Sequence, residues 1–515
     1  MKTSSKLVED AGLEDTTTSF LVQTDCGKKN LLQLLASSTS KKTIQRASFR
    51  QRCISAFRTF SDSEKKTWNM HWSRIHELEA SLEKQKAAFD SSNPTNDVFK
   101  DTIGQLSFQD DYFKPLNSVP YILLFVSLFK RFMVPGMAIL LPLFTWIAPY
   151  IFLKFIYKLD ISFKAYTGIL WSVWSGAGPD EPLSYKTMIQ GAFFLFSFAQ
   201  GIIQPVMTAR VCETTDRMMY AMGSDVLSLR ARYTYFKESC AANGVPFHFS
   251  TVLDPLVEMD PRMACIEIIE QPERLDRLFE SLGELEVLYK LSLHMDFNPV
   301  TFIDTRAATP YLHIEEYQDL RIPRSKRVSS SFHMDGVSHH SLLTGPNGGG
   351  KSSSLRAILQ VVLFSQVFGY ACAKKVELRP FQWISSGLLL RDIPGMKSMF
   401  ESEVRFAVQL LRKNKGIGLV LFDELFHSTN PPDGIRTAKK FLGELWKKPS
   451  IASIVSTHVF EIVEEAPPHV LRLCVPASAE GSTITYSYKL EEGVCKVSSV
   501  EQIWRQEGLA DKESG

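Results

Sequence analysis

A glycine-rich segment in the C-terminal half of the chain has the residue types and spacing of a phosphate-binding loop. Its glycines allow successive backbone N–H groups to curl around a phosphate. Lys351 would neutralise the β- and γ-phosphate oxygens, and Ser352 would ligate Mg²⁺. The segment follows the apolar run 341–343 and opens a helical run over 353–368, which is the strand, loop and helix order that such a loop requires. The predicted nucleotide-binding residues are Gly345, Pro346, Asn347, Gly348, Gly349, Gly350, Lys351, Ser352 and Ser353.

Two later apolar runs end in polar side chains that could act on a bound nucleotide. The run 418–422 is followed by Asp423 and Glu424, as in a buried strand that ends in two carboxylates. Asp423 would be a ligand of Mg²⁺, and Glu424 would orient and activate the attacking water. The run 454–457 ends at His458, which could sense or polarise the γ-phosphate. We therefore predict Glu424 and His458 as the catalytic residues, and Ser352 with Asp423 as the metal ligands.

These elements resemble the ATPase domain of the MutS mismatch-repair family over residues 300–510. The segment 395–403 is similar to the family's Ser-Thr-Phe-x-x-Glu motif, in which the serine reaches the nucleotide of the partner subunit. By position, Ser398 would make this contact to the nucleotide, and Phe400 and Glu403 would support it. The resemblance implies an α/β P-loop ATPase domain that binds ATP and Mg²⁺, hydrolyses ATP slowly and forms a homodimer or heterodimer.

The chain departs from the family pattern at three places. Phe426, His427 and Ser428 stand in place of a glycine-rich stretch, the pair 348–349 differs from the usual Met-Ala or Met-Gly, and Cys372 replaces a proline. These departures bear on turnover and dimer coupling more than on nucleotide binding. Transporter ATPases share the Gly-Pro-Asn-Gly loop but also carry a Leu-Ser-Gly-Gly-Gln segment, which this chain lacks, so the MutS branch is favoured.

Composition sets the limits on the class of protein. The chain has 515 residues, of which 44% are hydrophobic and 22% charged, so it is long and apolar enough to form several domains with cores. Its formal net charge of +2 gives no global reason to expect nucleic acid or an anionic membrane surface as a partner. The eight cysteines are scattered singly, which predicts neither a zinc site nor a disulfide framework.

A hydrophobic block lies ahead of the ATPase-like region. Residues 132–153 contain no charged residue, and 187–209 form a second uncharged stretch with several polar residues and Pro205. About 20 apolar residues suffice to span a bilayer. We favour a transmembrane hairpin over the alternative of two buried helices in a soluble core. A hairpin returns the chain to its starting side, and the need for ATP places the ATPase domain on the cytosolic face.

The predicted organisation has five parts. Residues 1–45 are predicted to form a disordered tail, and residues 46–118 a helical N-terminal region. The hydrophobic block occupies 119–209, and a helical core or lever follows over 210–300. The MutS-type ATPase domain covers 301–515. The predicted fold class is thus an α/β P-loop ATPase domain preceded by a mainly α-helical region with a transmembrane hairpin.

Three functional hypotheses remain open. The leading one is a membrane-associated MutS-like ATPase whose dimer acts as a clamp. The second is a soluble sensor of distorted double-stranded DNA in mismatch repair, in the nucleus or the cytoplasm, and the third is an ATP-binding scaffold without turnover. Mismatch-reading members of the family carry a Phe-x-Glu wedge that intercalates at the mispair. The chain offers Phe236-Lys237-Glu238, inside a helical segment, which chance explains better.

Overall fold

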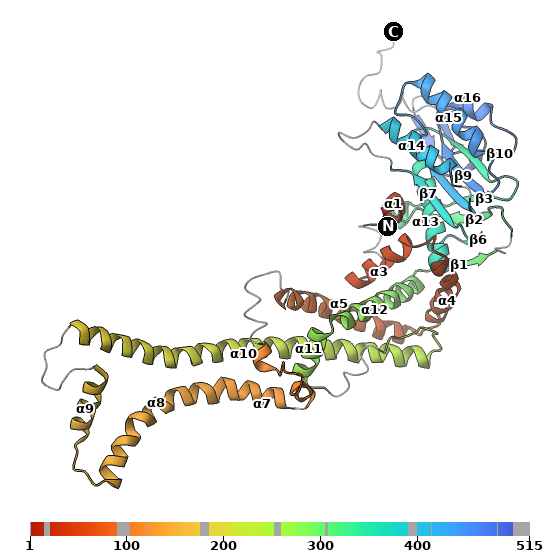
Figure 1. Ribbon diagram of the computed structural model, residues 1–515. Helices are drawn as coiled ribbons and strands as arrows, with labels where there is room; N and C mark the ends of the chain where they lie inside the picture. The colour runs from red at the N-terminus through yellow and green to blue at the C-terminus, as the bar shows by residue number, and fades with distance from the viewer. Residues whose placement is uncertain are drawn as a thin grey trace. The chain divides into compact units, whose positions relative to one another are not determined.

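The computed structural model describes residues 2–14, 21–89, 103–119, 121–175, 185–251, 259–303, 307–389, 399–413, 415–480 and 483–497. They form two compact units (Figure 1). The first, which we call the sheet unit, comprises Met1–Ser73, Phe236–Phe249 and Phe279–Gly515. The second, the helical unit, comprises Arg74–Tyr235 and Ser250–Leu278. The sheet unit is therefore assembled from three separate stretches, whereas the sequence suggested a linear series of domains.

A six-stranded, mainly parallel sheet forms the centre of the sheet unit. Its strand order is β13-β10-β4-β9-β8-β7, and only β13 runs antiparallel to its neighbour. All residues of β4, β8 and β9 are buried, as expected for parallel strands that are covered on both faces. The strands are β4 (His340–Thr344), β7 (Trp383–Gly387), β8 (Gly418–Phe422), β9 (Ile451–Ser456), β10 (Val470–Cys474) and β13 (Glu491–Glu492).

A second sheet of five strands has the order β3-β2-β6-β1-β5. Its strands are β1 (Phe297–Phe302), β2 (Leu312–Tyr317), β3 (Ser330–Met334), β5 (Tyr370–Cys372) and β6 (Lys375–Leu378). A short hairpin of β11 (Ala477–Glu480) and β12 (Thr483–Tyr486) completes the strands described. A 3₁₀ turn, η5 (Arg324–Lys326), lies between β2 and β3.

Helices of the sheet unit cover the central sheet (Figure 1). α13 (Lys351–Phe368) follows β4 directly and is buried along almost its whole length. α14 (Met399–Leu411), α15 (Pro431–Leu445) and α16 (Phe460–Glu464) contribute to a hydrophobic core with β8 and β9. α5 (Asp62–Phe89) and α12 (Pro272–Leu293) each contribute residues to both units.

The N-terminal residues are also part of the sheet unit. They form α1 (Lys2–Asp10), α3 (Asp25–Ala36) and α4 (Lys41–Arg58). α3 packs closely on α12, since a Cβ at Gly27 would collide with Glu286 and a Cβ at Gly283 with the Cys26 carbonyl. This finding corrects the expectation of a disordered tail over 1–45. The segment buries several apolar side chains, among them Leu13, Leu31 and Leu35. They are separated by many polar residues, so they form no regular period in the sequence.

Aromatic side chains fill the core beneath α5. Phe236 is buried, with its ring centroid 4.4 Å from that of Trp68 and 4.8 Å from that of Trp72. A ring enclosed in this way cannot intercalate into DNA without unfolding its surroundings. The structure thus gives Phe236 a packing role, in agreement with the interpretation of the Phe-x-Glu triplet as a chance match.

The helical unit contains a long run of apolar helix. Besides its parts of α5 and α12, the elements of this unit are η1 (Lys114–Ser118), α7 (Ile122–Leu128), the π-helical turn η2 (Phe129–Met133), α8 (Val134–Ile151), a second π-helical turn η3 (Phe152–Ile156), α9 (Phe163–Ser175), α10 (Tyr185–Ala242) as far as Tyr235, and α11 (Pro261–Glu270). α10 continues through Pro205 and past 209, where the sequence suggested that the hydrophobic block ends. α9 lies against α8, where the Tyr166 hydroxyl donates to the Trp146 carbonyl over 2.7 Å. The segment between the two predicted spans is therefore itself partly helical.

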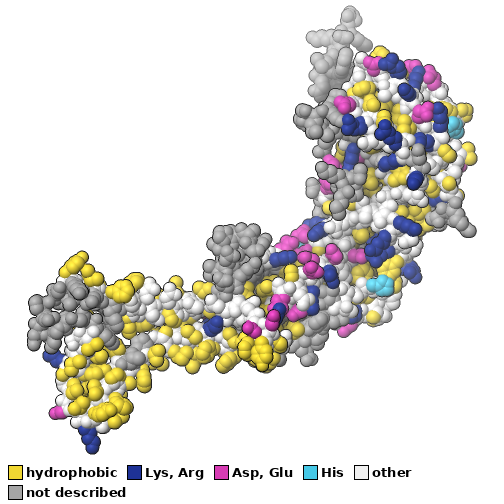
Figure 2. Space-filling view, in the orientation of Figure 1, with side chains coloured by type: hydrophobic (Ala, Val, Ile, Leu, Met, Phe, Trp, Pro, Cys, Tyr) yellow, Lys and Arg dark blue, Asp and Glu magenta, His cyan; other side chains and the backbone are white. Residues whose placement is uncertain are grey.

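Many apolar side chains of these helices are exposed. Figure 2 shows hydrophobic side chains gathered over the α8 and α9 end of the helical unit, with few charges among them. Phe125, Phe144 and Phe193 are each at least two-thirds exposed, at 68%, 68% and 70%. By length and composition, two described helical stretches could span a bilayer, Ile122–Leu141 and Gly191–Ala242. The stretch Ile122–Leu141 begins ten residues before the first predicted span, 132–153.

Candidate active site

The glycine-rich loop joins the end of β4 to the start of α13. Gly345, Gly348 and Gly350 have φ values of 142°, 75° and 101°, which side chains rarely adopt, so glycine is needed at these turns. The Lys351 ammonium donates to the carbonyls of Gly345 and Pro346 over 2.9 and 3.2 Å. Its buried position at the first turn of α13 places a cation and the helix N-terminus at the same point, which favours anionic phosphate groups.

Two carboxylates follow β8, the neighbour of β9 in the sheet. The Ser456 hydroxyl, at the end of β9, donates to the Asp423 carboxylate and accepts from the Glu424 backbone N–H over 2.9 Å. Burial lowers the pKa of Lys351, and the nearby carboxylates of Glu424 and Asp423 oppose that shift. The carboxyl ends of β4, β8 and β9 therefore bring Lys351, Asp423 and Glu424 together.

His458 lies next to Glu424. Its Nε2 is 3.2 Å from the Glu424 carboxylate oxygen Oε1. Because an ionised carboxylate only accepts hydrogen bonds, this contact assigns the proton to Nε2. The same hydrogen bond is the main cause that lowers the pKa of Glu424, so Glu424 is ionised at neutral pH and able to accept a hydrogen bond from water. The structure thus joins the two predicted catalytic residues in one pair.

The residues at this site fit a Mg²⁺ ion chemically. Mg²⁺ prefers hard oxygen ligands, which the Asp423 carboxylate and the Ser352 hydroxyl would supply. The Ser456 hydroxyl fixes one oxygen of Asp423 by donating to it. The donor set predicted from the sequence is therefore consistent with the polar environment at the end of β8.

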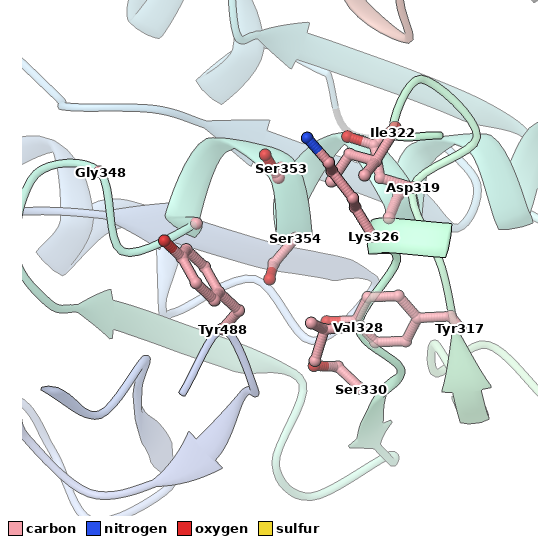
Figure 3. A pocket seen from close by; sticks show the side chains of 12 residues that line it. Tyr317, Asp319, Ile322, Lys326, Val328, Ser330, Gly348, Ser353, Ser354 and Tyr488 are labelled. Atoms are coloured by element: carbon pink, nitrogen blue, oxygen red, sulfur yellow. The ribbon is translucent and has the colours of Figure 1, made fainter. Parts of the chain in front are cut away.

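A pocket of about 360 Å³ opens beside the glycine-rich loop. Figure 3 shows Tyr488 on the loop side of the pocket and Tyr317, Val328 and Ser330 on the opposite side. Asp319 also lines it; this carboxylate is buried and accepts from the Gln360 amide over 3.1 Å. These lining residues carry no signal in the sequence, because they come from β2, the 318–330 segment and the chain after β12, which only the fold brings together.

Comparison with known proteins also indicates a nucleotide-binding domain in this part of the chain. Residues 341–511 match MutS domain V, which is an ATPase domain. This part of the chain belongs to the MutS family. The DNA mismatch repair protein MutS of Thermotoga sp. (strain RQ2) is 26% identical over 262 residues, which cover 49% of this chain and 32% of that protein. The protein of the same name from Thermotoga neapolitana is 27% identical over 241 residues, covering 45% of this chain and 29% of the relative. The matched region thus spans about a third of the length of these relatives.

The MutS motif around Ser398 is only partly described. Ser398 lies outside the described residues, so its predicted contact with a partner's nucleotide stays a prediction. Phe400 and Glu403 lie on α14, and the Phe400 ring centroid is 6.1 Å from that of Phe426. Phe426 is buried among α14, α15 and β8, which explains how a bulky residue is accommodated where the family pattern has glycine.

Proposed function

We propose that the chain is an ATP-binding and ATP-hydrolysing MutS-type protein that dimerises through its nucleotide sites. The observation that carries this proposal is the convergence of Lys351, Asp423 and the Glu424–His458 pair at the ends of adjacent strands. Few arrangements other than a nucleoside triphosphatase site need a buried lysine at a helix N-terminus beside a paired carboxylate and histidine.

Each residue has a separate task in this proposal. Lys351 turns from the loop carbonyls to the β- and γ-phosphate oxygens, and the loop N–H groups hold the β-phosphate. Ser352 and Asp423 hold Mg²⁺, which supplies positive charge beside the phosphates. Glu424 accepts a hydrogen bond from the attacking water and orients it, while the His458 Nε2–H holds the Glu424 carboxylate in place. The pocket lined by Tyr488 and Tyr317 receives the nucleoside.

The proposed dimer contains two composite sites. Each would combine Lys351, Ser352, Asp423, Glu424 and His458 of one chain with Ser398 of its partner, and ATP binding would clamp the helical arms around a ligand. Sedimentation of the Glu424→Gln variant tests whether ATP binding forms the dimer, since this variant should bind ATP without hydrolysing it. We expect a dimer with ATP and a monomer with ADP, and we expect Ser398→Ala to weaken the dimer. A monomer at all ATP concentrations would exclude the clamp.

We further propose that the apolar helices of the helical unit insert into a membrane, with the ATPase on the cytosolic side. Exposure of the apolar side chains of α8 and early α10 supports this proposal. The two cationic side chains near the start of the apolar helices, Lys130 and Arg131, also support the proposal, because both have hydrogen-bond partners within the helical unit. Lys130 donates to the Gln105 carbonyl over 2.6 Å, and Arg131 donates to Glu213 over 2.9 Å.

Extraction of cell membranes with alkaline carbonate tests the membrane proposal. The protein should stay in the membrane pellet, and release into the wash would refute insertion. Leu140, which is 64% exposed, offers a specific variant. Leu140→Arg should weaken membrane retention, because a central arginine costs about 3 kcal/mol during insertion. Glu444→Gln, an exposed change on α15, should leave retention unchanged.

A second candidate function is the sensing of distorted double-stranded DNA without a membrane. It is favoured by the name of the relatives, DNA mismatch repair protein MutS. The burial of Phe236 removes the one residue that resembled a mismatch wedge. Filter binding of matched and mismatched duplexes, with and without ATP, separates the candidates. ATP-dependent preference for the mismatch would favour the DNA sensor, whereas equal, salt-sensitive binding would exclude mismatch recognition.

A further inference from the structure

A carboxylate on α14 holds the loop that follows the two active-site carboxylates. Glu403 is only 1% exposed. Its Oε2 accepts from the Ser428 hydroxyl over 2.6 Å, and its Oε1 lies 3.5 Å from Nδ1 of His427. Burial raises the pKa of Glu403, and the Ser428 hydrogen bond opposes the shift. A buried carboxylate is costly unless it is bound, so this contact ties α14 to the loop.

The same loop contacts the catalytic carboxylate through its backbone. His427 Nδ1 is 2.7 Å from the Glu424 carbonyl oxygen. Because a carbonyl only accepts, Nδ1 carries the proton in this contact. The chain of contacts runs from Glu403, through Ser428 and His427, to the backbone of Glu424.

The backbone of the loop needs such support. Glu424 and Phe426 have φ values of 52° and 55°, in the left-handed region that is unfavourable for residues with side chains. Two non-glycine residues in this region within three positions persist only where the surroundings hold them. Phe426 is held by its burial in the core, and the His427 and Ser428 side chains hold the other side of the turn.

We propose that Glu403 is a positioning residue for ATP hydrolysis. It holds the 425–428 loop through Ser428 and His427, and so fixes the direction in which the Glu424 carboxylate points. The proposal rests on the proposed function of the site. The proposal also explains why Phe426, His427 and Ser428 stand in place of flexible glycines. Their side chains make the contacts that hold the loop, and Ser428 donates to the buried Glu403 carboxylate, which glycine could not do.

A set of three variants tests the proposal by steady-state kinetics. Ser428→Ala removes the donor, Glu403→Leu removes the carboxylate that accepts from it, and the double variant removes the pair. We expect kcat to fall on the order of 10- to 100-fold in each, with KM within about twofold of wild type. The double variant should be no slower than the slower single variant, because the two residues act as a unit. Glu403→Gln, which keeps an acceptor for Ser428, should restore most of the activity.

Hydrogen exchange of residues 423–430 supplies a readout that does not depend on turnover. Exchange should accelerate in Ser428→Ala and stay unchanged in Glu444→Gln, which alters an exposed carboxylate on α15. Unchanged kcat and exchange in Ser428→Ala would overturn the proposal, as would full additivity in the double variant. If wild type hydrolyses no ATP, the proposed function fails by itself, while loop exchange still decides whether Glu403 holds the loop. If Glu403→Leu does not fold, Ser428→Ala alone decides.

Discussion

The N-terminal anchor offers a direct test of the finding that residues 21–36 belong to the sheet unit. Thr24 is the N-cap of α3, where its hydroxyl accepts from the Gly27 N–H over 3.0 Å. The same hydroxyl donates to the fully buried carboxylate of Glu286. Thr24→Val keeps the shape of the side chain and removes both hydrogen bonds, together with a weaker 3.1 Å contact to the Cys26 thiol, so no cavity complicates the result.

The expected cost follows from these two contacts. Loss of an N-cap side chain costs about 1 kcal/mol, and loss of a buried hydrogen bond to a carboxyl group costs about 1–3 kcal/mol. Thr24→Val should therefore lower the free energy of unfolding of the sheet unit by about 2–4 kcal/mol. Thr24→Ser keeps the hydroxyl and should recover most of this loss.

Urea unfolding followed by tryptophan fluorescence measures the change, because Trp68 and Trp72 are buried in the sheet unit. Ser40 provides a matched control. It is the N-cap of α4 but makes no side-chain cap hydrogen bond, so Ser40→Ala should change stability by less than about 0.5 kcal/mol. If Thr24→Val shifts the midpoint no more than Ser40→Ala, the N-terminal segment is not packed as described and the sequence-based expectation of a tail is restored.

Three further predictions concern the nucleotide site and the buried acid. Tyr488→Ala should weaken ATP binding about 5- to 160-fold, since aromatic stacking on a base contributes about 1–3 kcal/mol. Titration calorimetry should show unchanged affinity for inorganic triphosphate, and equal losses for both ligands would contradict the nucleoside assignment. His458→Ala should lower kcat on the order of 10- to 100-fold, with KM unchanged, because Glu424 loses the N–H that holds it; a change in KM alone would argue against this role. Burial raises the pKa of Glu286 above its ordinary 4.5, so the folded state binds this proton more tightly and stability falls as pH rises from 4.5 through the raised value. Glu286→Gln should flatten that decline in urea midpoints measured between pH 4 and 8, and a profile parallel to that of wild type would show that Glu286 does not titrate as described.

The nucleotide site was predictable because its parts are local in sequence. Gly345 to Ser352 form one continuous segment, and Asp423, Glu424 and His458 each lie within two residues of the end of a strand. Parallel strands place such ends at one edge of the sheet, so their proximity follows from the fold class. In the described residues, Lys351, Asp423, Glu424 and His458 lie close together, while their roles stay predictions.

Other features depend on contacts between distant segments. Thr24 and Glu286 are far apart in the sequence, and so are Glu403 and Ser428, yet each pair forms a buried hydrogen bond. The pocket beside the glycine-rich loop combines Tyr317 with Tyr488 in the same way. Polar pairs of this kind leave no periodic pattern, so sequence reasoning could not find them. The apolar helices were predicted from composition, and the second predicted span, 187–209, already included Pro205. The unbroken continuation of α10 to Ala242 was not predicted, because the uncharged stretch ends at 209.

The central claim is that Glu424 activates water at a site that binds ATP through Lys351. The most direct test compares ATP binding and phosphate release in wild type and Glu424→Gln, with Glu444→Gln as the control. We predict unchanged ATP affinity in Glu424→Gln and a fall in phosphate release of about 10²- to 10⁴-fold, with both quantities unchanged in Glu444→Gln. Phosphate release at the wild-type rate from Glu424→Gln would contradict the account.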